Sequence, residues 1–351
     1  MLTDIIKIFV PLTVSFFVGI ALAPVLTHYL YKHKAWKKRS GKVDPSGNAT
    51  PIFNQLHAHK EVGTPRMGGI IIWASVVITV LVIWLFSLFF PSDWSIKLNF
   101  LSRNQTWLPF AVLIFSSLVG LLDDWLEVRG NGNYVAGGLA FRQRALIVLA
   151  IGLVIAWWLV AKLGINAILI PFIGPGWVGV WLVPIVLVVL LGLFSSGVID
   201  GLDGLAGGVM AIIFATYAVI AFFQHQIDLA TFCAVITGGI LAFLWFNIPP
   251  ARFYMSETGI LGLTTTLTIV AFLTDAVVVL PIIALPLVVT SLSVAMQLSS
   301  KKFLGRKVFL VAPLHHHFEA KGWPAHKVVM RYWVISIISA VIGMVVFFAG
   351  R

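Results

Sequence analysis

Ten runs of mostly apolar residues, each about long enough to cross a bilayer as a helix, occupy most of the sequence. They lie at 5–30, 68–90, 107–122, 143–161, 178–194, 205–223, 228–246, 258–273, 276–296 and 332–350. Of the 351 residues, 60% are apolar and 11% are charged, which excludes a water-soluble protein. Because Cys233 is the single cysteine, a disulfide scaffold is excluded too. The sequence predicts an all-α, polytopic membrane protein with about ten transmembrane helices in one domain, 1–351.

The basic residues indicate how such a chain is oriented. The net charge of +11 could suggest a nucleic-acid partner in a soluble protein, but cytoplasmic loops of membrane proteins also carry excess Lys and Arg. Of the 24 basic residues, 19 fall in the odd-numbered connections between runs. We therefore expect both termini on the outer side, the odd-numbered loops in the cytoplasm, and no nucleic-acid partner. The first run lacks a small-residue cleavage site, so we expect it to be retained as a helix.

The acidic residues gather on the same predicted side. Nine of the thirteen lie in or beside the inner loops, namely Asp44, Glu61, Asp123, Asp124, Glu127, Asp200, Asp203, Glu257 and Glu319. His57, His59 and the run His315–His317 lie there as well. We expect the chemistry in five loops on this side, at about 31–67, 123–142, 195–204, 247–257 and 297–331. The internal repeat of many transporters is missing.

Two of these loops carry pairs of acids. The sequence Gly-Leu-Leu-Asp-Asp at 120–124 ends the third run, and adjacent carboxylates at a membrane boundary are costly without a cation or a shared proton. Asp-Gly-Leu-Asp-Gly begins at Asp200, and its glycines allow the backbone to approach a ligand closely. Solvated helix-end acids and a simple helix cap are the plainer alternatives. Capping accounts for one acid of the second pair but not for both.

Of two further inner loops, one carries a single acid and the other carries a run of histidines. Glu257, at the mouth of the eighth run, is as readily a helix-capping residue as a ligand of Mg²⁺, which prefers carboxylate oxygens, water and phosphates. The run His315–His317 could suggest a transition-metal site, but consecutive histidines cannot all face one ion. Contact with an anionic ligand is the better interpretation. Carboxylates for a divalent cation, with cationic groups for phosphates, indicate phosphoryl transfer with a lipid as one reactant.

The ordered motifs resemble a known family. Gly-Thr-Pro-Arg-Met-Gly-Gly at 63–69, Leu-Asp-Asp at 122–124, Asp-Gly-Leu-Asp-Gly-Leu-Ala at 200–206, the segment 246–259 and Pro-Leu-His-His-His-Phe-Glu at 313–319 are similar to those of phospho-N-acetylmuramoyl-pentapeptide transferases. The resemblance implies a ten-helix, Mg²⁺-dependent enzyme of the bacterial cytoplasmic membrane, with its active site facing the cytoplasm. It implies transfer of phospho-MurNAc-pentapeptide from UDP-MurNAc-pentapeptide to undecaprenyl phosphate, which forms lipid I and releases UMP. Members are often dimeric, so a homodimer is possible.

Residue roles follow from the same resemblance. It implies that Asp123 and Asp124 orient or deprotonate the lipid phosphate and that Asp200 is the central catalytic acid. Metal binding is implied for Asp200 and Glu257. The implied substrate contacts are Asp203, Asn247 and Tyr254 around the uridine, His315, His316 and His317 on the sugar diphosphate, and Lys60 and Gln297.

The sequence departs from the family pattern at several positions. Gly197 stands where Asn is usual, Glu127 where Lys is usual, and Ile260 where Ser is usual. Glu257 replaces the usual Asp and keeps the carboxylate. We suggest that Arg66, an unusual residue in its motif, supplies the cation lost at Glu127. A divergent active enzyme is favoured over a degenerate one.

Three other functions stay open on the sequence. A transferase of another UDP-sugar phosphate, such as GlcNAc-1-phosphate, is disfavoured by the histidine run. A transporter needs ionisable groups near span centres, and the two exceptions of most interest, Asp275 and His225, fall at predicted outer turns. A catalytically degenerate membrane scaffold would tolerate loss of Asp200.

Overall fold

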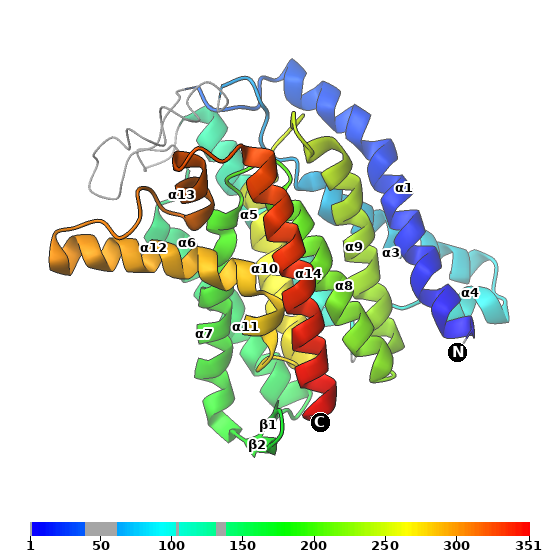
Figure 1. Ribbon diagram of the computed structural model, residues 1–351. Coiled ribbons are helices and arrows are strands. Elements are labelled where there is room, and N and C mark those ends of the chain that lie inside the picture. Colours follow the sequence, from blue (N-terminus) through cyan, green and yellow to red (C-terminus); the bar gives the residue numbers. More distant parts are fainter. Residues whose placement is uncertain (1, 39–61, 103–104, 131–137) are drawn as a thin grey trace.

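The computed structural model describes residues 2–38, 62–102, 105–130 and 138–351, which form a bundle of helices (Figure 1). The helices are α1 (Leu2–Lys32), α3 (Ile70–Phe89), α4 (Asp93–Leu98), α5 (Trp107–Arg129), α6 (Phe141–Trp157), α7 (Leu182–Ser195), α8 (Leu205–Phe223), α9 (Ile227–Asn247), α10 (Ser256–Leu273), α11 (Leu280–Ile283), α12 (Leu285–Leu304), α13 (Leu314–Ala320) and α14 (Ala325–Ala349). Short helical turns η1 (Trp158–Lys162), η2 (Gly179–Trp181) and η3 (Ser196–Ile199) extend α6 and flank α7. Strands β1 (Ala167–Ile170) and β2 (Gly174–Trp177) form an antiparallel hairpin.

Within the described ranges, nine helical segments are long and apolar enough to cross a membrane. They coincide with nine of the ten apolar runs, which confirms an all-α, multi-pass membrane protein. Both chain ends lie at the end of the bundle opposite α13 (Figure 1). That arrangement agrees with an even number of crossings between the termini.

The ninth run, 276–296, differs from expectation because it is not one continuous helix. A short α11 is followed by a break at Ala284, and α12 then runs on to Leu304, beyond the predicted end. Pro281 and Pro286 lie at the starts of the two helices, where a proline that lacks an N–H is tolerated. α12 lies across the other helices rather than along them (Figure 1).

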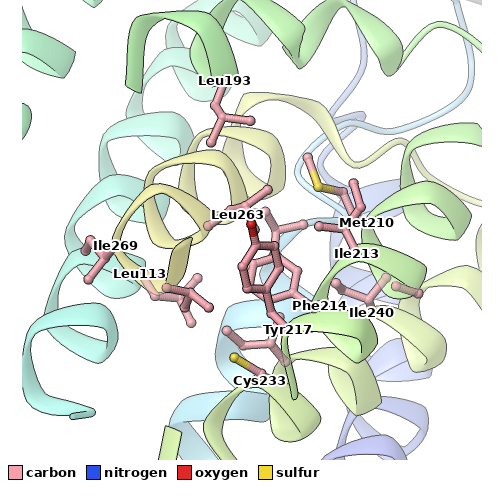
Figure 2. Close-up of a cluster of buried hydrophobic side chains, with 14 of the residues drawn as sticks. Leu113, Leu193, Met210, Ile213, Phe214, Tyr217, Cys233, Ile240, Leu263 and Ile269 are labelled. Carbon is pink, nitrogen blue, oxygen red and sulfur yellow. The ribbon is translucent and has the colours of Figure 1, made fainter. Parts of the chain in front are cut away.

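Helices α8, α9 and α10 form the centre of the bundle. In the most apolar 18-residue stretch of each of these helices, between 78% and 89% of the residues are buried. The share is 50% or less in the other candidate spans of the described chain. Helices buried in this way contact other helices on most sides, whereas the less buried spans leave apolar faces for lipid. Figure 2 shows part of this core, to which α8 contributes Tyr217, α9 Cys233 and Ile240, α10 Leu263 and α5 Leu113. α10, whose first turn holds Glu257, is thus packed among the other helices along its length.

Helices α5 and α10 approach each other closely because small residues face small residues. A methyl group added at Gly120 would overlap the backbone of Glu257 and reach 2.8 Å from the amide nitrogen of Thr258. Gly262 contacts the Ser117 side chain in the same way, one layer deeper. Glycine and serine let helix backbones pack in contact in membrane proteins. The last turn of α5, with its two acids, is therefore held against the first turn of α10.

Candidate active site

Asp124 is a fully buried acid where α5 meets α10. Its Oδ2 accepts hydrogen bonds from the Thr258 backbone N–H at 2.9 Å and from the Thr258 hydroxyl at 2.5 Å. The Arg66 guanidinium lies 3.7 Å from Oδ1, which has no hydrogen-bond partner among the described residues. A buried carboxylate is tolerated only with such compensation. Asp124 thus has one oxygen held by Thr258 and one buried oxygen whose hydrogen-bonding capacity is not used within the described residues.

Asp123 and Glu257 share one arginine. Arg144, in the first turn of α6, places Nη1 2.7 Å from Glu257 Oε1 and 3.4 Å from Asp123 Oδ2. Asp123 Oδ1 accepts the Leu139 N–H at 2.5 Å, and Gly138 lies so close that a Cβ there would be 2.7 Å from the same oxygen. Ends of α5, α6 and α10 are therefore joined through these carboxylates. Sequence reasoning missed Arg144, which it counted only as a loop cation.

Glu127 lies one turn further along α5, between two cations. It forms an ion pair with Arg66, and its Oε1 lies 3.0 Å from Lys37 Nζ. All three side chains are largely buried, because the Glu127 and Lys37 side chains are 10% exposed and that of Arg66 is 20% exposed. The structure places Arg66 directly against Glu127, while its role as the replacement for the missing lysine stays a prediction. The acid at the usual lysine position thus positions a neighbouring cation beside Asp124.

This pairing predicts strong coupling between Arg66 and Glu127. Arg66→Met and Glu127→Gln are each expected to lower the free energy of unfolding by about 1–3 kcal/mol, because each leaves a partly buried charge behind. The double variant is expected to lose about 1–2 kcal/mol less than the sum of the single losses. Unfolding of the purified protein in detergent, measured for all four members of the cycle, checks this. Additive losses would show that the two residues act independently.

The Asp-Gly-Leu-Asp loop lies between the start of α10 and α13. Asp200 Oδ2 accepts the Ser256 N–H at 2.9 Å, next to Glu257. Gly201 allows the loop to touch the histidine run, since a Cβ there would reach 2.8 Å from His316 Nε2 and closer to His315 Nε2. The predicted catalytic acid and the predicted sugar-diphosphate contacts are therefore brought together.

The three histidines divide between two surroundings. His315 and His316 are buried, with ring centroids 4.2 Å apart, and His316 Nδ1 lies 2.7 Å from Glu319 Oε2. His317 points elsewhere, and its Nδ1 accepts the Leu310 N–H at 3.1 Å. Burial, and to a lesser degree Lys321, lowers the pKa of His317 below its usual value. We infer a neutral His317 at pH 7 that carries its proton on Nε2.

Other predicted substrate contacts also brace the loops. Asn247 accepts the Gly204 N–H at 2.8 Å and donates to the Phe253 carbonyl at 2.9 Å. Asp203 Oδ2 accepts the Ala251 N–H at 3.3 Å. These bonds join the end of α9 to the start of α8. Contact of either residue with uridine stays a prediction.

Three more predicted residues lie apart from the acid cluster or outside the described chain. Gln297, on α12, exchanges hydrogen bonds of 2.9 and 3.0 Å with the backbone of Phe309, and so holds the segment that precedes α13. Tyr254 pairs through its backbone with Pro65 and Gly68, at 2.9 and 2.8 Å. Lys60 lies outside the described residues.

Two departures from the family pattern meet in space. Gly197, in η3, lies under Ile260 of α10, and a Cβ at 197 would be 2.7 Å from Ile260 Cγ2. Ile260 is 3% exposed, so it cannot move into solvent. An apolar contact therefore replaces the polar Asn and Ser expected at this place.

We predict that Gly197→Asn lowers the free energy of unfolding by about 1–3 kcal/mol, because the new side chain overlaps Ile260. Adding Ile260→Ser to that variant is expected to restore at least half of the loss. Thermal unfolding of the single and double variants measures both effects. If Gly197→Asn destabilised the protein equally with Ile and with Ser at position 260, overlap with Ile260 would not be the cause of the destabilisation.

The acids also indicate which cation could bind. The donors around α5 and α10 are carboxylate oxygens, the ligands that Mg²⁺ prefers, and the buried Asp124 Oδ1 lacks a hydrogen-bond partner. Within the described ranges, no group of three or more His, Cys, Asp or Glu side chains is arranged as a complete metal site. Because Mg²⁺ usually keeps waters and substrate phosphates, the predicted ligands Asp200 and Glu257 fit a site that the substrate completes.

Ionisable groups at the opposite end of the bundle have local partners. Asp275 Oδ1 accepts the Leu169 N–H at 2.8 Å in the turn after α10, and Lys7 Nζ lies 2.5 Å from Asp228. Burial raises the pKa of Asp275 despite that hydrogen bond and the nearby Arg351. His225 lies in the turn between α8 and α9. These positions agree with the predicted turns and favour an enzyme over a transporter.

Fold and acid cluster together define a membrane-embedded transferase, and comparison with known proteins agrees. The glycosyl transferase family 4 profile matches residues 106–275, which contain the acids of α5, the Asp-Gly-Leu-Asp loop and Glu257. A phospho-N-acetylmuramoyl-pentapeptide-transferase of Chloroflexus aggregans is 32% identical over 331 residues, covering 90% of this chain and 83% of that protein. Enzymes of the same name from Caldanaerobacter subterraneus and Geobacillus kaustophilus are 33% and 34% identical, over 95% and 96% of this chain and 96% and 97% of theirs. The chain belongs to the phospho-N-acetylmuramoyl-pentapeptide transferase family.

Proposed function

We propose that the protein transfers phospho-MurNAc-pentapeptide from UDP-MurNAc-pentapeptide to undecaprenyl phosphate. An oxygen of the lipid phosphate attacks the phosphorus that carries the sugar, the bond to the uridylyl phosphate breaks, and UMP leaves with that bridging oxygen. The products are UMP and lipid I. The observation that carries the proposal is the contact of the Asp200–Gly201 loop with His315 and His316, beside Asp123, Asp124 and Glu257.

The surroundings of the acid pair support a lipid acceptor. Leu122 and Trp125 flank Asp123 and Asp124 on α5, and these two apolar residues are 50% and 41% exposed. A polyprenyl chain can lie on this apolar surface while its phosphate reaches the turn that holds the acids. Asp123 and Asp124 then orient the lipid phosphate or accept its proton.

The donor substrate lies on the other side of the acids in this proposal. His315 and His316 contact the sugar diphosphate, and Asp203, Asn247 and Tyr254 surround the uridine. Asp200 and Glu257 would hold Mg²⁺, which when bound neutralises charge on the phosphate oxygens. Phosphoryl transfer depends chiefly on such positioning and charge stabilisation.

Purified protein incubated with undecaprenyl phosphate and one UDP-sugar at a time tests the proposal. UMP release is expected with UDP-MurNAc-pentapeptide and not with UDP-GlcNAc. Release from UDP-GlcNAc alone would identify the protein as a transferase of another sugar phosphate. Trapping of a phosphorylated Asp200 without lipid acceptor would exclude direct attack by the lipid.

We also propose that the site faces the cytoplasm at the bacterial cytoplasmic membrane. Lys301 is exposed at the end of α12, on a loop predicted to be cytoplasmic, and Cys233 is buried. A Lys301→Cys variant is expected to react with a membrane-impermeant maleimide in inside-out vesicles and not in intact spheroplasts. Labelling in intact spheroplasts would reverse the orientation.

A further inference from the structure

Arg144 is the cation that joins two acids of the candidate site, and neither the motifs nor the proposed roles include it. Its Nη1 lies 2.7 Å from Glu257 Oε1 and 3.4 Å from Asp123 Oδ2. The Arg144 side chain is 22% exposed, and those of Glu257 and Asp123 are 29% and 5% exposed. The ion pairs are therefore only partly screened by solvent.

Arg144 reduces the electrostatic repulsion between the two carboxylates that it contacts. Glu257 and Asp123 come from different helices, and two carboxylates brought together without a cation repel each other. Asp123 is already held through its other oxygen by the Leu139 N–H at 2.5 Å. Arg144 therefore fixes the orientation of Glu257 relative to α5 when no metal is bound.

The same arginine is only partly used in this arrangement. Its Nε is buried and has no hydrogen-bond partner among the described residues, as is also true of Asp124 Oδ1 in the same cluster. A buried donor without a partner is costly. The cluster therefore holds one buried donor and one buried acceptor whose hydrogen bonds are not made within the described residues.

We propose that Arg144 is a positioning residue that serves as the resident counter-cation of Glu257 and Asp123 and competes with the divalent cation for Glu257. The proposal rests on the proposed function only in naming that cation. Arg144 holds the two carboxylates in register in the metal-free protein and gives up Glu257 when the divalent cation binds. Metal affinity is then set by an exchange of cations rather than by filling a vacant site.

Binding of Mn²⁺ to the purified full chain, followed by electron paramagnetic resonance without nucleotide sugar or lipid, tests this. Arg144→Gln is expected to lower the apparent Kd for Mn²⁺ about tenfold, because one competing charge is removed. Its metal-free Tm is expected to fall and its Tm gain on adding Mg²⁺ to exceed that of the unmodified protein. The matched control is Arg142→Gln. Arg142 is exposed and lies two residues before Arg144 on α6, and its substitution is expected to leave the Mn²⁺ Kd and the Tm values unchanged.

Two further variants keep the test decisive. Arg144→Lys, which keeps the charge but cannot bridge two carboxylates as a planar fork does, is expected to give an intermediate Kd, and it serves if Arg144→Gln does not fold. In a Glu257→Gln background, Arg144→Gln is expected to change the Mn²⁺ Kd by less than about twofold. The carboxylate for which Arg144 and the metal compete is then absent.

Unchanged or weaker Mn²⁺ binding by both Arg144 variants would overturn the proposal. Loss of UMP binding in the presence of EDTA, with unchanged Mn²⁺ affinity, would also overturn it and would assign Arg144 to the substrate phosphate instead. Failure of the proposed function is a separate outcome. In that case the unmodified protein releases no UMP, while the Arg144 variants still change the Mn²⁺ Kd as expected.

Discussion

Asp200→Asn is expected to lower kcat for transfer at least about 100-fold while the protein stays folded. The amide oxygen of Asn can still accept the Ser256 N–H that Asp200 accepts at 2.9 Å, so the loop keeps its position. What the variant loses is the negative charge beside Glu257 and the buried histidines. UMP release under saturating substrates, with the Tm of the same preparation, measures both quantities.

The matched control is Asp275→Asn at the opposite end of the bundle. Asp275 also accepts a backbone N–H, from Leu169 at 2.8 Å, but it lies far along α10 from the acid cluster. Its substitution is expected to leave kcat within about twofold, because it touches no group of the site. An Asp200→Asn enzyme that retains most of its activity would show that the acid cluster does not carry the chemistry.

Gly120→Ala is expected to damage both the fold and the candidate site. The added methyl group would overlap the backbone of Glu257, which lies in the first turn of a buried helix and cannot rotate away as a side chain can. Overpacking of this kind costs about 1–3 kcal/mol, and the accompanying shift of Glu257 and Thr258 is expected to reduce kcat as well. Thermal unfolding and UMP release are the two measurements.

Gly192→Ala, on α7, provides the comparison. Gly192 is a helical glycine whose added Cβ would meet no other atom within 4 Å, so only helix propensity changes. We expect stability within about 1 kcal/mol of the original chain and unchanged activity. If both alanine variants behaved alike, close contact of α5 with α10 would not be what positions Glu257.

The fold was largely predictable because apolar runs long enough to span a bilayer leave few alternatives. The run 276–296 was not, since hydropathy records neither the break that prolines allow near Ala284 nor the direction of α12 across the bundle. Direction depends on packing against neighbouring helices, which no local pattern contains.

The acids of the site were also predictable, because adjacent carboxylates at a membrane boundary are rare and costly. Their partners were not. Arg144 and Thr258 contact Glu257 and Asp124 only because α5, α6 and α10 meet at one end, and a count of loop cations cannot distinguish such contacts. The ion pair of Arg66 with Glu127 was not predicted either, since the sequence suggested only that Arg66 supplies the cation that is missing at position 127.

The most direct test of the central claim is the joint yield of both products from purified protein. With UDP-MurNAc-pentapeptide labelled in the sugar, undecaprenyl phosphate and Mg²⁺, label in the lipid phase and free UMP are expected to rise in equal molar amounts. Both are expected to stop when the lipid phosphate is left out. UMP release without transfer of label to the lipid, or transfer that continues undiminished in Asp200→Asn, would contradict a transferase built on this acid cluster.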